Sequence, residues 1–153
     1  RYDTAAQVIT GGGAAIVGAA TDYWITGASS VPVAANASAN LTLTATPTDI
    51  TGASITFTTA VAGSVVVIGS FDFGLAVGGE ILGGYLNVDG SNVAQQALLS
   101  GSVQRCCVTR QWTVAVAAGS HTFKLQAARV SGSNAGHSTN ATHTGLSLQF
   151  TRA

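Results

Sequence analysis

Two cysteines, the only two of the chain, stand side by side in the stretch QRCCVTRQWTVAVAAGSHTFKLQA, with a histidine close behind them. Thiol redox chemistry needs a CxxC spacing, a helix N-terminus or a basic cluster, and Arg105 alone is a weak substitute. Side chains alternate along an extended strand, so Cys106 falls in line with Val108 and Trp112 while Cys107 faces the other way, which excludes a disulfide between them. We therefore predict that Cys106 is a small core side chain and that Cys107 is a surface thiol, either free or bridging two chains.

The three histidines do not have the spacing of a metal site. His121 opens a strand after a tight turn, and His137 and His143 lie in or near the polar loop SGSNAGHSTNATH, without HxH or HxxxH spacing. Zinc needs three or four convergent ligands, and a distant Asp or Glu would have to join His137 and His143 to supply them. We predict that these histidines are polar loop side chains and that no metal is bound.

The carboxylates are scattered, so their spacing assembles no acid and base pair. They are Asp3, Asp22, Asp49, Asp72, Glu80 and Asp89. Turns explain Asp49 and Asp89, and only folding could bring Asp72 near another carboxylate. The glycine-rich string GGGAAIVG lacks the Lys-Ser/Thr of a phosphate loop. The sequence thus predicts no catalytic, cofactor-binding or metal-ligating residue, no cofactor and no enzyme activity.

From Leu41 onward, apolar and β-branched residues alternate with small polar ones, which indicates successive strands. The predicted inward face comprises Val65, Val67, Phe71, Phe73 and Leu75 in one strand and Thr144, Leu146, Leu148 and Phe150 in the last. Hairpin turns are expected at Asp89-Gly90 and at AAGSH. Because no crossover helix separates the strands, we predict an all-β fold, an antiparallel two-sheet jelly roll of about eight strands.

Charge is scarce in this chain. Of 153 residues 46% are hydrophobic and 8% are charged, with six basic and six acidic residues and a formal net charge of +0. A phosphate backbone or an anionic bilayer attracts basic clusters, so neither nucleic acid nor a membrane is an expected partner. A chain with so little charge often covers much of its surface in an assembly, which favours an oligomer or a particle.

Residues 1–40 differ in composition from the rest and are rich in Ala, Gly and Ser. They include Tyr23 and Trp24 but too little patterned apolar surface for a core of their own. We predict an extended N-terminal arm over residues 1–40 that docks on another surface, with a neighbouring subunit favoured, and a jelly-roll domain over residues 41–153 that folds without it.

Four stretches, TDITGASITFTT, GGYLNVDG, WTVAVAAGSHTFKLQA and THTGLSLQF, carry a resemblance between residues 41 and 153. In this order they resemble the jelly-roll domains of phage virion proteins, which are similar in pattern to the complement globular head and tumour necrosis factor trimers. The resemblance implies a homotrimer used as a capsid decoration, a head fibre or a tail-fibre tip, and it transfers no functional residue. The chain has neither a collagen-like stalk nor a long heptad repeat, which departs from full-length complement proteins and long fibres.

Two function classes remain open at this point. The first is a non-enzymatic structural protein on the surface of a bacteriophage virion, whose residues 1–40 attach it to other virion proteins such as the major capsid protein. The second is a host-binding adhesin, in which the outer loops of the same trimer bind a surface carbohydrate or protein. Copy number distinguishes them, because a decoration protein is present in hundreds of copies per particle and an adhesin in a handful.

Overall fold

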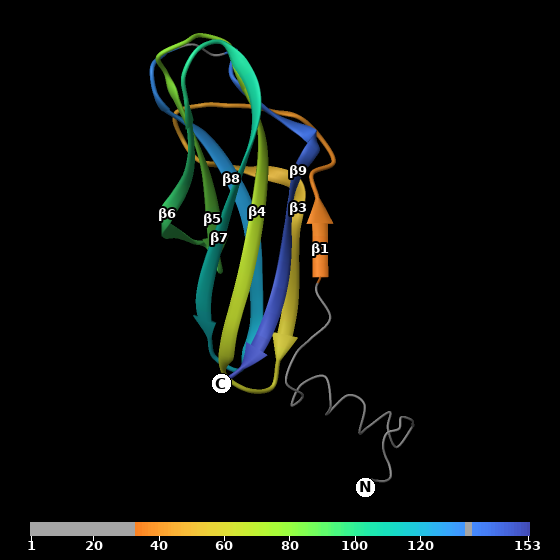
Figure 1. Cartoon of the computed structure of the whole chain (residues 1–153). Helices are drawn as coiled ribbons and strands as arrows, with labels where there is room; N and C mark the ends of the chain where they lie inside the picture. Colours follow the sequence, from red (N-terminus) through yellow and green to blue (C-terminus); the bar gives the residue numbers. More distant parts are fainter. Residues whose placement is uncertain (1–32, 134–135) are drawn as a thin grey trace, which may run out of the picture.

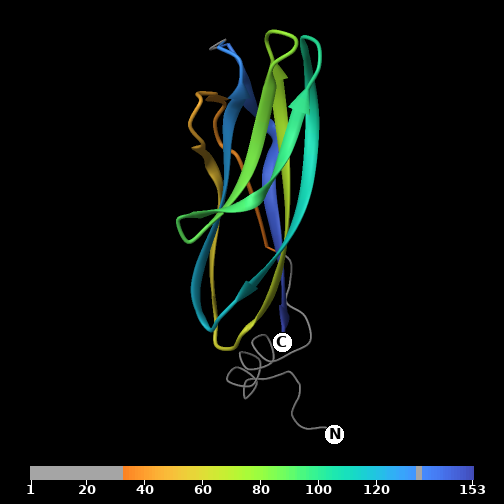
Figure 2. The same ribbon diagram turned by 90° about the vertical axis from the view of Figure 1, so that its left-hand side faces the viewer.

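The computed structural model describes residues 33–133 and 136–153, which form two antiparallel sheets (Figure 1). The strands are β1 (Val33–Asn36), β2 (Leu41–Thr42), β3 (Thr48–Thr59), β4 (Gly63–Leu75), β5 (Ile81–Val88), β6 (Ser91–Ser100), β7 (Gln104–Val116), β8 (Gly119–Ser131) and β9 (Ser138–Arg152). One sheet has the order β1-β9-β4-β7, with β2 also paired to β9, and the other has the order β3-β8-β5-β6. The sheets lie face to face in an elongated sandwich (Figure 2), which confirms the predicted jelly roll. Within these described ranges, no helix is long and apolar enough to cross a membrane.

Both predicted hairpin turns are present. Asp89 and Gly90 join β5 to β6 with φ angles of 51° and 92°, the left-handed conformation that a two-residue hairpin turn requires. Ala117 and Ala118 join β7 to β8 within the AAGSH segment. These turns set the antiparallel register of β5 with β6 and place the start of β8 beside the end of β3.

The core lies between the two sheets and follows the alternation in the sequence. Every residue of the predicted inward face is buried, including Phe71 and Phe73 of β4, whose stacked rings have centroids 5.5 Å apart. Phe57 of β3 packs its ring 5.9 Å from that of Phe123 on β8 and 5.7 Å from that of Phe150 on β9, so aromatic contacts join the two sheets. Burial of such side chains is the main stabilising contribution in a sandwich without helices.

Part of the predicted arm lies on this chain's own sheet. Strand β1 pairs with β9, with Val33 opposite Leu148 and Asn36 opposite Gly145. After β1, the Ala37 amide donates to the Thr144 carbonyl at 2.8 Å. Residues 33–40 therefore lie on strands of the same chain, on β9 and, through the Ser38 amide bonded to the Thr51 carbonyl at 2.8 Å, on β3. Residues 1–32, with Tyr23 and Trp24, lie outside the described residues, and their docking stays a prediction.

Candidate functional site

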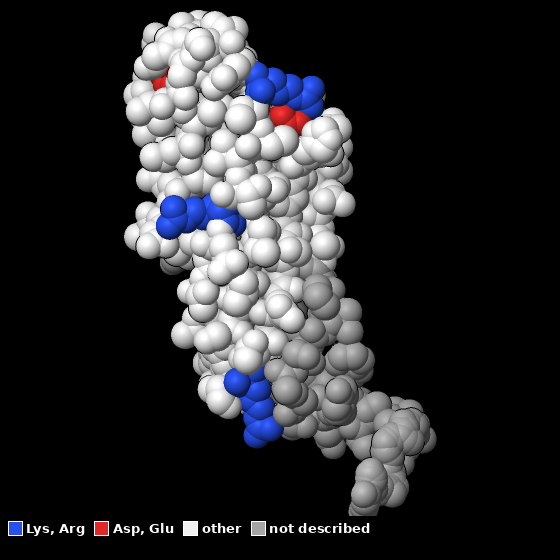
Figure 3. Space-filling model, viewed as in Figure 1, with Lys and Arg blue, Asp and Glu red and all other residues white. Residues whose placement is uncertain are grey.

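The outward face of the sheet formed by β9, β4 and β7 carries no charged side chain along most of its length. Four rows cross this face, each with one β4 residue flanked by its partners on β7 and β9. The rows are Ser64 with Ala115 and Thr151, Val66 with Thr113 and Gln149, Ile68 with Gln111 and Ser147, and Ser70 with Thr109 and Gly145. Ile68, in the middle strand, is 42% exposed. In Figure 3, which views this face, charged side chains are correspondingly few.

Charged residues of the strands lie elsewhere. The outward face of the other sheet carries Asp49, which accepts hydrogen bonds from Lys124 Nζ at 2.7 Å and from Gln126 Nε2 at 2.6 Å. Arg110 of β7 is turned toward β6, where its Nη2 donates to Gln95 Oε1 at 2.9 Å. The few charged side chains of the strands are therefore absent from these four rows, and the sequence alone did not show which sheet carries the rows.

A polar cluster begins where the uncharged rows end, around Asp72 of β4 and Arg105 of β7. Arg105 Nε donates to Asp72 Oδ1 at 2.8 Å and its Nη2 donates to Asp72 Oδ2 at 2.5 Å, a bidentate pair. The Asp72 side chain is 2% exposed although it points away from the core, because its neighbours cover it, whereas that of Arg105 is 55% exposed. The hydrogen bonds from Arg105 hold the pKa of the Asp72 carboxyl below its usual value, against burial, which acts to raise it.

A bulge in β9 brings His143 over Asp72. Residues Ser70 and Asp72 of β4 lie opposite Gly145 and Asn140 of β9, so residues 141–144 face a single β4 residue. Thr144 Oγ1 accepts from the Asp72 amide at 2.9 Å and donates to the Asn140 carbonyl at 2.6 Å, which fixes the bulge. His143 Nδ1 then lies 3.3 Å from Asp72 Oδ2.

The chain before β2 also holds this bulge in place. Asn40 Oδ1 accepts a hydrogen bond from the Ala141 amide at 2.8 Å, beside the bond from Ala37 to Thr144. The position of His143 therefore depends on residues 37–40, which the sequence assigned to the arm.

Cys107 completes the cluster, because β7 places it directly opposite Asp72. As predicted, it is an exposed free thiol. The prediction for Cys106 was wrong, since this thiol is also free and exposed. Cys106 lies opposite the buried Phe73, but β7 is an edge strand, and on its inward side only Trp112 and Val116 are fully buried.

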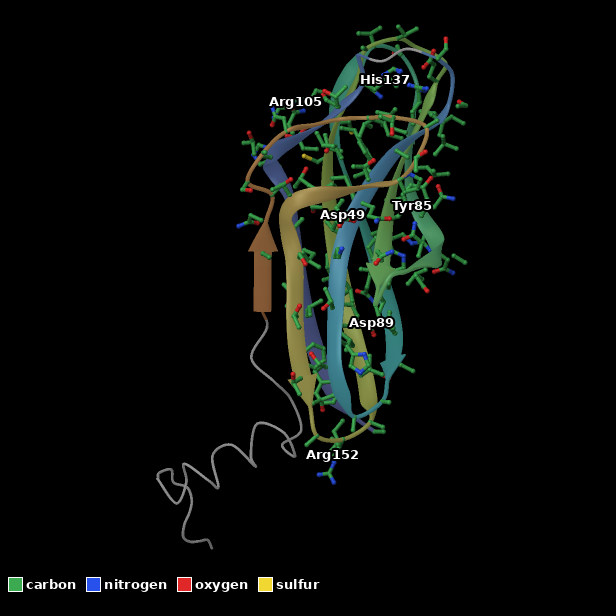
Figure 4. All side chains as sticks on the ribbon, turned by 180° about the vertical axis from the view of Figure 1, so that it is seen from behind. Asp49, Tyr85, Asp89, Arg105, His137 and Arg152 are labelled. Atoms are coloured by element: carbon green, nitrogen blue, oxygen red, sulfur yellow. The ribbon has the colours of Figure 1, made fainter. Side chains whose placement is uncertain are left out.

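The structure also corrects the prediction for His137, which is not a polar surface side chain. Its ring is fully buried, with Nδ1 accepting a hydrogen bond from the Ala76 amide at 2.9 Å and Nε2 lying 2.7 Å from Glu80 Oε1. These contacts tie the segment between β4 and β5 to the segment before β9. Figure 4 shows His137 and Arg105 toward one end of the sandwich and Arg152 at the other. His137 is thus a structural connector of one loop end.

His121, by contrast, lies where the sequence placed it, just after the β7–β8 turn. Its Nδ1 is 2.7 Å from Asp89 Oδ2, and Asp89 Oδ1 accepts from the Thr122 amide at 2.7 Å. The hydrogen bond from Thr122 lowers the pKa of Asp89, and the bond to Asp89 raises the pKa of His121. The pair ties the β5–β6 turn to β8, and in Figure 4 Asp89 lies well away from Arg105 of the cluster around Asp72.

No protein-family model matches the chain, and no curated protein matches its sequence. Among solved structures, the chain is similar to Eiger TNF from S. frugiperda, with a TM-score of 0.49 and 12% identity over 80% of this chain and 92% of that chain. It is also similar to murine APRIL, with a TM-score of 0.47 and 9% identity over 78% of this chain and 98% of that one.

The same fold matches parts of two longer chains. One is from the T13 IBDV viral particle, with a TM-score of 0.46 and 11% identity over 78% of this chain and 30% of that chain. The other is a β-glucosidase from Paenibacillus barengoltzii, with a TM-score of 0.40 and 13% identity over 78% of this chain and 10% of that chain. At these scores and identities the likenesses assign neither a function nor a partner, since one fold serves many functions.

Proposed function

We propose that this chain is a non-enzymatic structural protein of a bacteriophage virion, a homotrimer that decorates the capsid or forms a head fibre and is anchored through its N-terminal residues. The observation that carries self-association is the uncharged outward face of β4, β7 and β9. The sequence resemblance between residues 41 and 153 supports the assignment to a virion and the trimeric state.

Several properties of the face support a contact between copies of this chain. Its central strand exposes Ile68 between small polar side chains, and no charge would have to be desolvated along the four rows when the face is covered. A face of this composition on a chain with a net charge of +0 would favour association in solution. The opposite sheet, with Asp49 paired to Lys124, keeps charges exposed and is the face suited to remain in water.

The alternative, a host-binding adhesin, is favoured by exposed apolar residues in two neighbouring loops. Val77, between β4 and β5, is 38% exposed, and Val103, between β6 and β7, is 66% exposed. The Gly79 amide donates to the Gly101 carbonyl at 2.7 Å, which holds the two loops together. Such a pair of apolar loop residues could contact a receptor, in the way that loops on a rigid scaffold commonly bind.

The proposal is tested with particles that lack this protein. Full-length chain and a chain that begins at Val33 are each added to the particles, and the copies that sediment are counted. Anchoring by the N-terminal residues predicts binding of the full-length chain in hundreds of copies per particle and little binding of the shortened chain. Equal binding of both would contradict the anchor, and a handful of copies per particle would favour the adhesin.

A further inference from the structure

Three side chains with different metal-binding atoms meet at the end of the uncharged face. A carboxylate oxygen of Asp72, the Cys107 sulfur and an imidazole nitrogen of His143 all lie within 4.8 Å of one another. In the part of the chain that the structure describes, this is the one group of three or more His, Cys, Asp or Glu side chains close enough to share an ion. None of the three belongs to a motif visible in the sequence, because they come from three different strands.

The fold positions these three side chains before any ion is present. Asp72 and Cys107 are opposite each other in the regular pairing of β4 with β7, and the β9 bulge supplies His143 from the other side of β4. The bulge is fixed on both sides, by Thr144 bonding to the Asp72 amide and by Asn40 bonding to Ala141. Strand pairing thus fixes the backbone positions of the three ligands, which reduces the conformational freedom lost when a metal binds.

The chemistry of the ligand set fits a borderline-soft divalent cation. Thiolate, imidazole and carboxylate are the three ligand types that bind zinc in proteins. Ligand atoms bound to one tetrahedral zinc ion are roughly 3.3–3.8 Å apart, given bond lengths of about 2.0–2.3 Å. The separation of 3.3 Å between His143 Nδ1 and Asp72 Oδ2 is already in this range, and the Cys107 sulfur, within 4.8 Å of the other two ligand atoms, has to move closer to them to bind the same ion.

Arg105 is the competitor for the same carboxylate. It bonds to both Asp72 oxygens, and its positive charge disfavours a second cation nearby. Its side chain is more than half exposed, so it can leave Oδ2 to the metal while Nε keeps Oδ1. Binding then exchanges one hydrogen bond to an exposed guanidinium for coordination by three side chains.

We propose that Asp72, Cys107 and His143 form a binding site for Zn²⁺ or a similar divalent transition metal, with a water molecule as the fourth ligand. On binding, the Cys107 thiol loses its proton to solvent, and the thiolate and carboxylate together balance the two charges of the ion. This revises the sequence expectation that the chain binds no metal. It also places the ion beside the row of Ser70 and Thr109, at the border of the face proposed for contacts between copies.

The test uses the full chain under a phosphine reductant, titrated with Zn²⁺ in a calorimeter and with Co²⁺ in a spectrophotometer. We expect one bound ion per chain and, for Co²⁺, the near-ultraviolet charge-transfer band that a thiolate ligand produces. Cys107→Ser should abolish the band and weaken Zn²⁺ binding by at least about tenfold, because even residues that only support ligands are worth about that much. The matched control is Cys106→Ser, one residue away, which should retain the band and the affinity.

Two further variants distinguish loss of a metal ligand from a general loss of folding. Arg105→Gln removes the competing cation and should tighten Zn²⁺ binding, whereas His143→Gln should weaken it; circular dichroism confirms that each variant is folded. The proposal is overturned if Zn²⁺ does not bind the wild-type chain at millimolar concentration. It is equally overturned if Cys106→Ser and Cys107→Ser have the same Zn²⁺ affinity and the same Co²⁺ band, or if folded Arg105→Gln binds Zn²⁺ more weakly than wild type.

Discussion

The ion pair of Asp89 with His121 makes the stability of the fold depend on pH. The hydrogen bond from the Thr122 amide lowers the pKa of Asp89 below 3.8, and the bond to Asp89 raises the pKa of His121 above 6.5. The contribution of protonated His121 to stability is therefore complete below pH 6.5 and is lost as pH rises through its raised pKa. The contribution of ionised Asp89 is present above pH 3.8 and is lost as pH falls through its lowered pKa.

We predict that His121→Gln flattens the alkaline side of the stability profile. The free energy of unfolding of the wild type should decline as pH rises above 6.5, by less than about 1 kcal/mol from this pair, since Asp89 is about half exposed and solvent screens the interaction. Urea melts from pH 5 to pH 9 measure this decline, with Lys124→Gln as a control for an exposed ion pair that does not involve histidine. An unchanged alkaline slope in His121→Gln would show that the pair does not contribute.

The two cysteines give a second prediction for single residues. Because both thiols are exposed, Cys106→Ser and Cys107→Ser should each change the free energy of unfolding by no more than about 0.5 kcal/mol in metal-free buffer. Urea denaturation of the two variants measures this. A loss of about 1 kcal/mol or more in Cys106→Ser alone would restore the sequence prediction that this thiol is buried.

The burial of a side chain could be predicted from the alternation in the sequence where the strand is central in its sheet and the second sheet covers it. Phe71, Phe73 and Leu148 are buried as predicted because their strands are central in the sheet. Alternation could not show that β7 is an edge strand, so it misplaced Cys106. It also could not bring together Asp72, Cys107 and His143, because strand pairing and a bulge in β9 create that proximity.

At the scale of elements, the segment around β1 is the part of the sandwich that the sequence did not reveal. After Val33 its residues are Ala and Asn, which carry little strand signal, and their pairing with β9 depends on a partner far along the chain. The strands from Thr48 onward and both tight turns were predictable, because their alternation and turn residues are local signals.

We predict that two truncations differ sharply. A chain that begins at Val33 should keep the melting temperature of the full chain. A chain that begins at Leu41 should lose a few kcal/mol of stability, because it lacks the pairing of β1 and the bonds from Ala37 and Asn40, each worth about 1 kcal/mol. Calorimetric melts of the three chains decide this, and equal melting temperatures would mean that residues 33–40 add nothing to the sandwich.

Close packing between the sheets gives another prediction. A Cβ on Gly84 of β5 would lie 2.6 Å from ring atoms of Phe71, a fully buried side chain of the facing sheet. Gly84→Ala should therefore destabilise the fold by about 1–3 kcal/mol through overpacking. Gly74→Ala is the control, because the nearest atom to its Cβ would be the small Ser138 Oγ, at 3.0 Å, and the next would be at the ordinary contact distance of 3.8 Å. Urea melts should separate the two variants, and similar losses would argue against tight contact between the sheets.

At the scale of the whole molecule, the distribution of charge distinguishes the two faces of the sandwich. The sequence showed that charge is scarce, but only strand pairing showed that the rows from Ser64 to Ser70 and their partners contain none. Asp49 pairs with Lys124 on the other sheet, and on this sheet the pair of Asp72 with Arg105 lies only at one end, beyond the rows. An assembly through the uncharged face would leave this charged sheet in water.

A charge introduced on the uncharged face should therefore disrupt the trimer, whereas a charge introduced on the other sheet should not. Ile68→Asp places a charge in the middle of the uncharged face, and because Ile68 is 42% exposed we expect the variant to fold. We predict that it dissociates the trimer while circular dichroism stays that of a folded β protein. Thr56→Asp, on the outward face of β3 where Thr56 is exposed, should leave the trimer intact.

The molar mass in solution is the most direct test of the proposed self-association. Light scattering on the purified full-length chain at micromolar concentration and neutral pH should give three times the mass of one chain for the wild type and for Thr56→Asp, and the mass of one chain for Ile68→Asp. A monomeric wild type, or an Ile68→Asp variant that remains trimeric, would contradict assembly through the face of β4, β7 and β9.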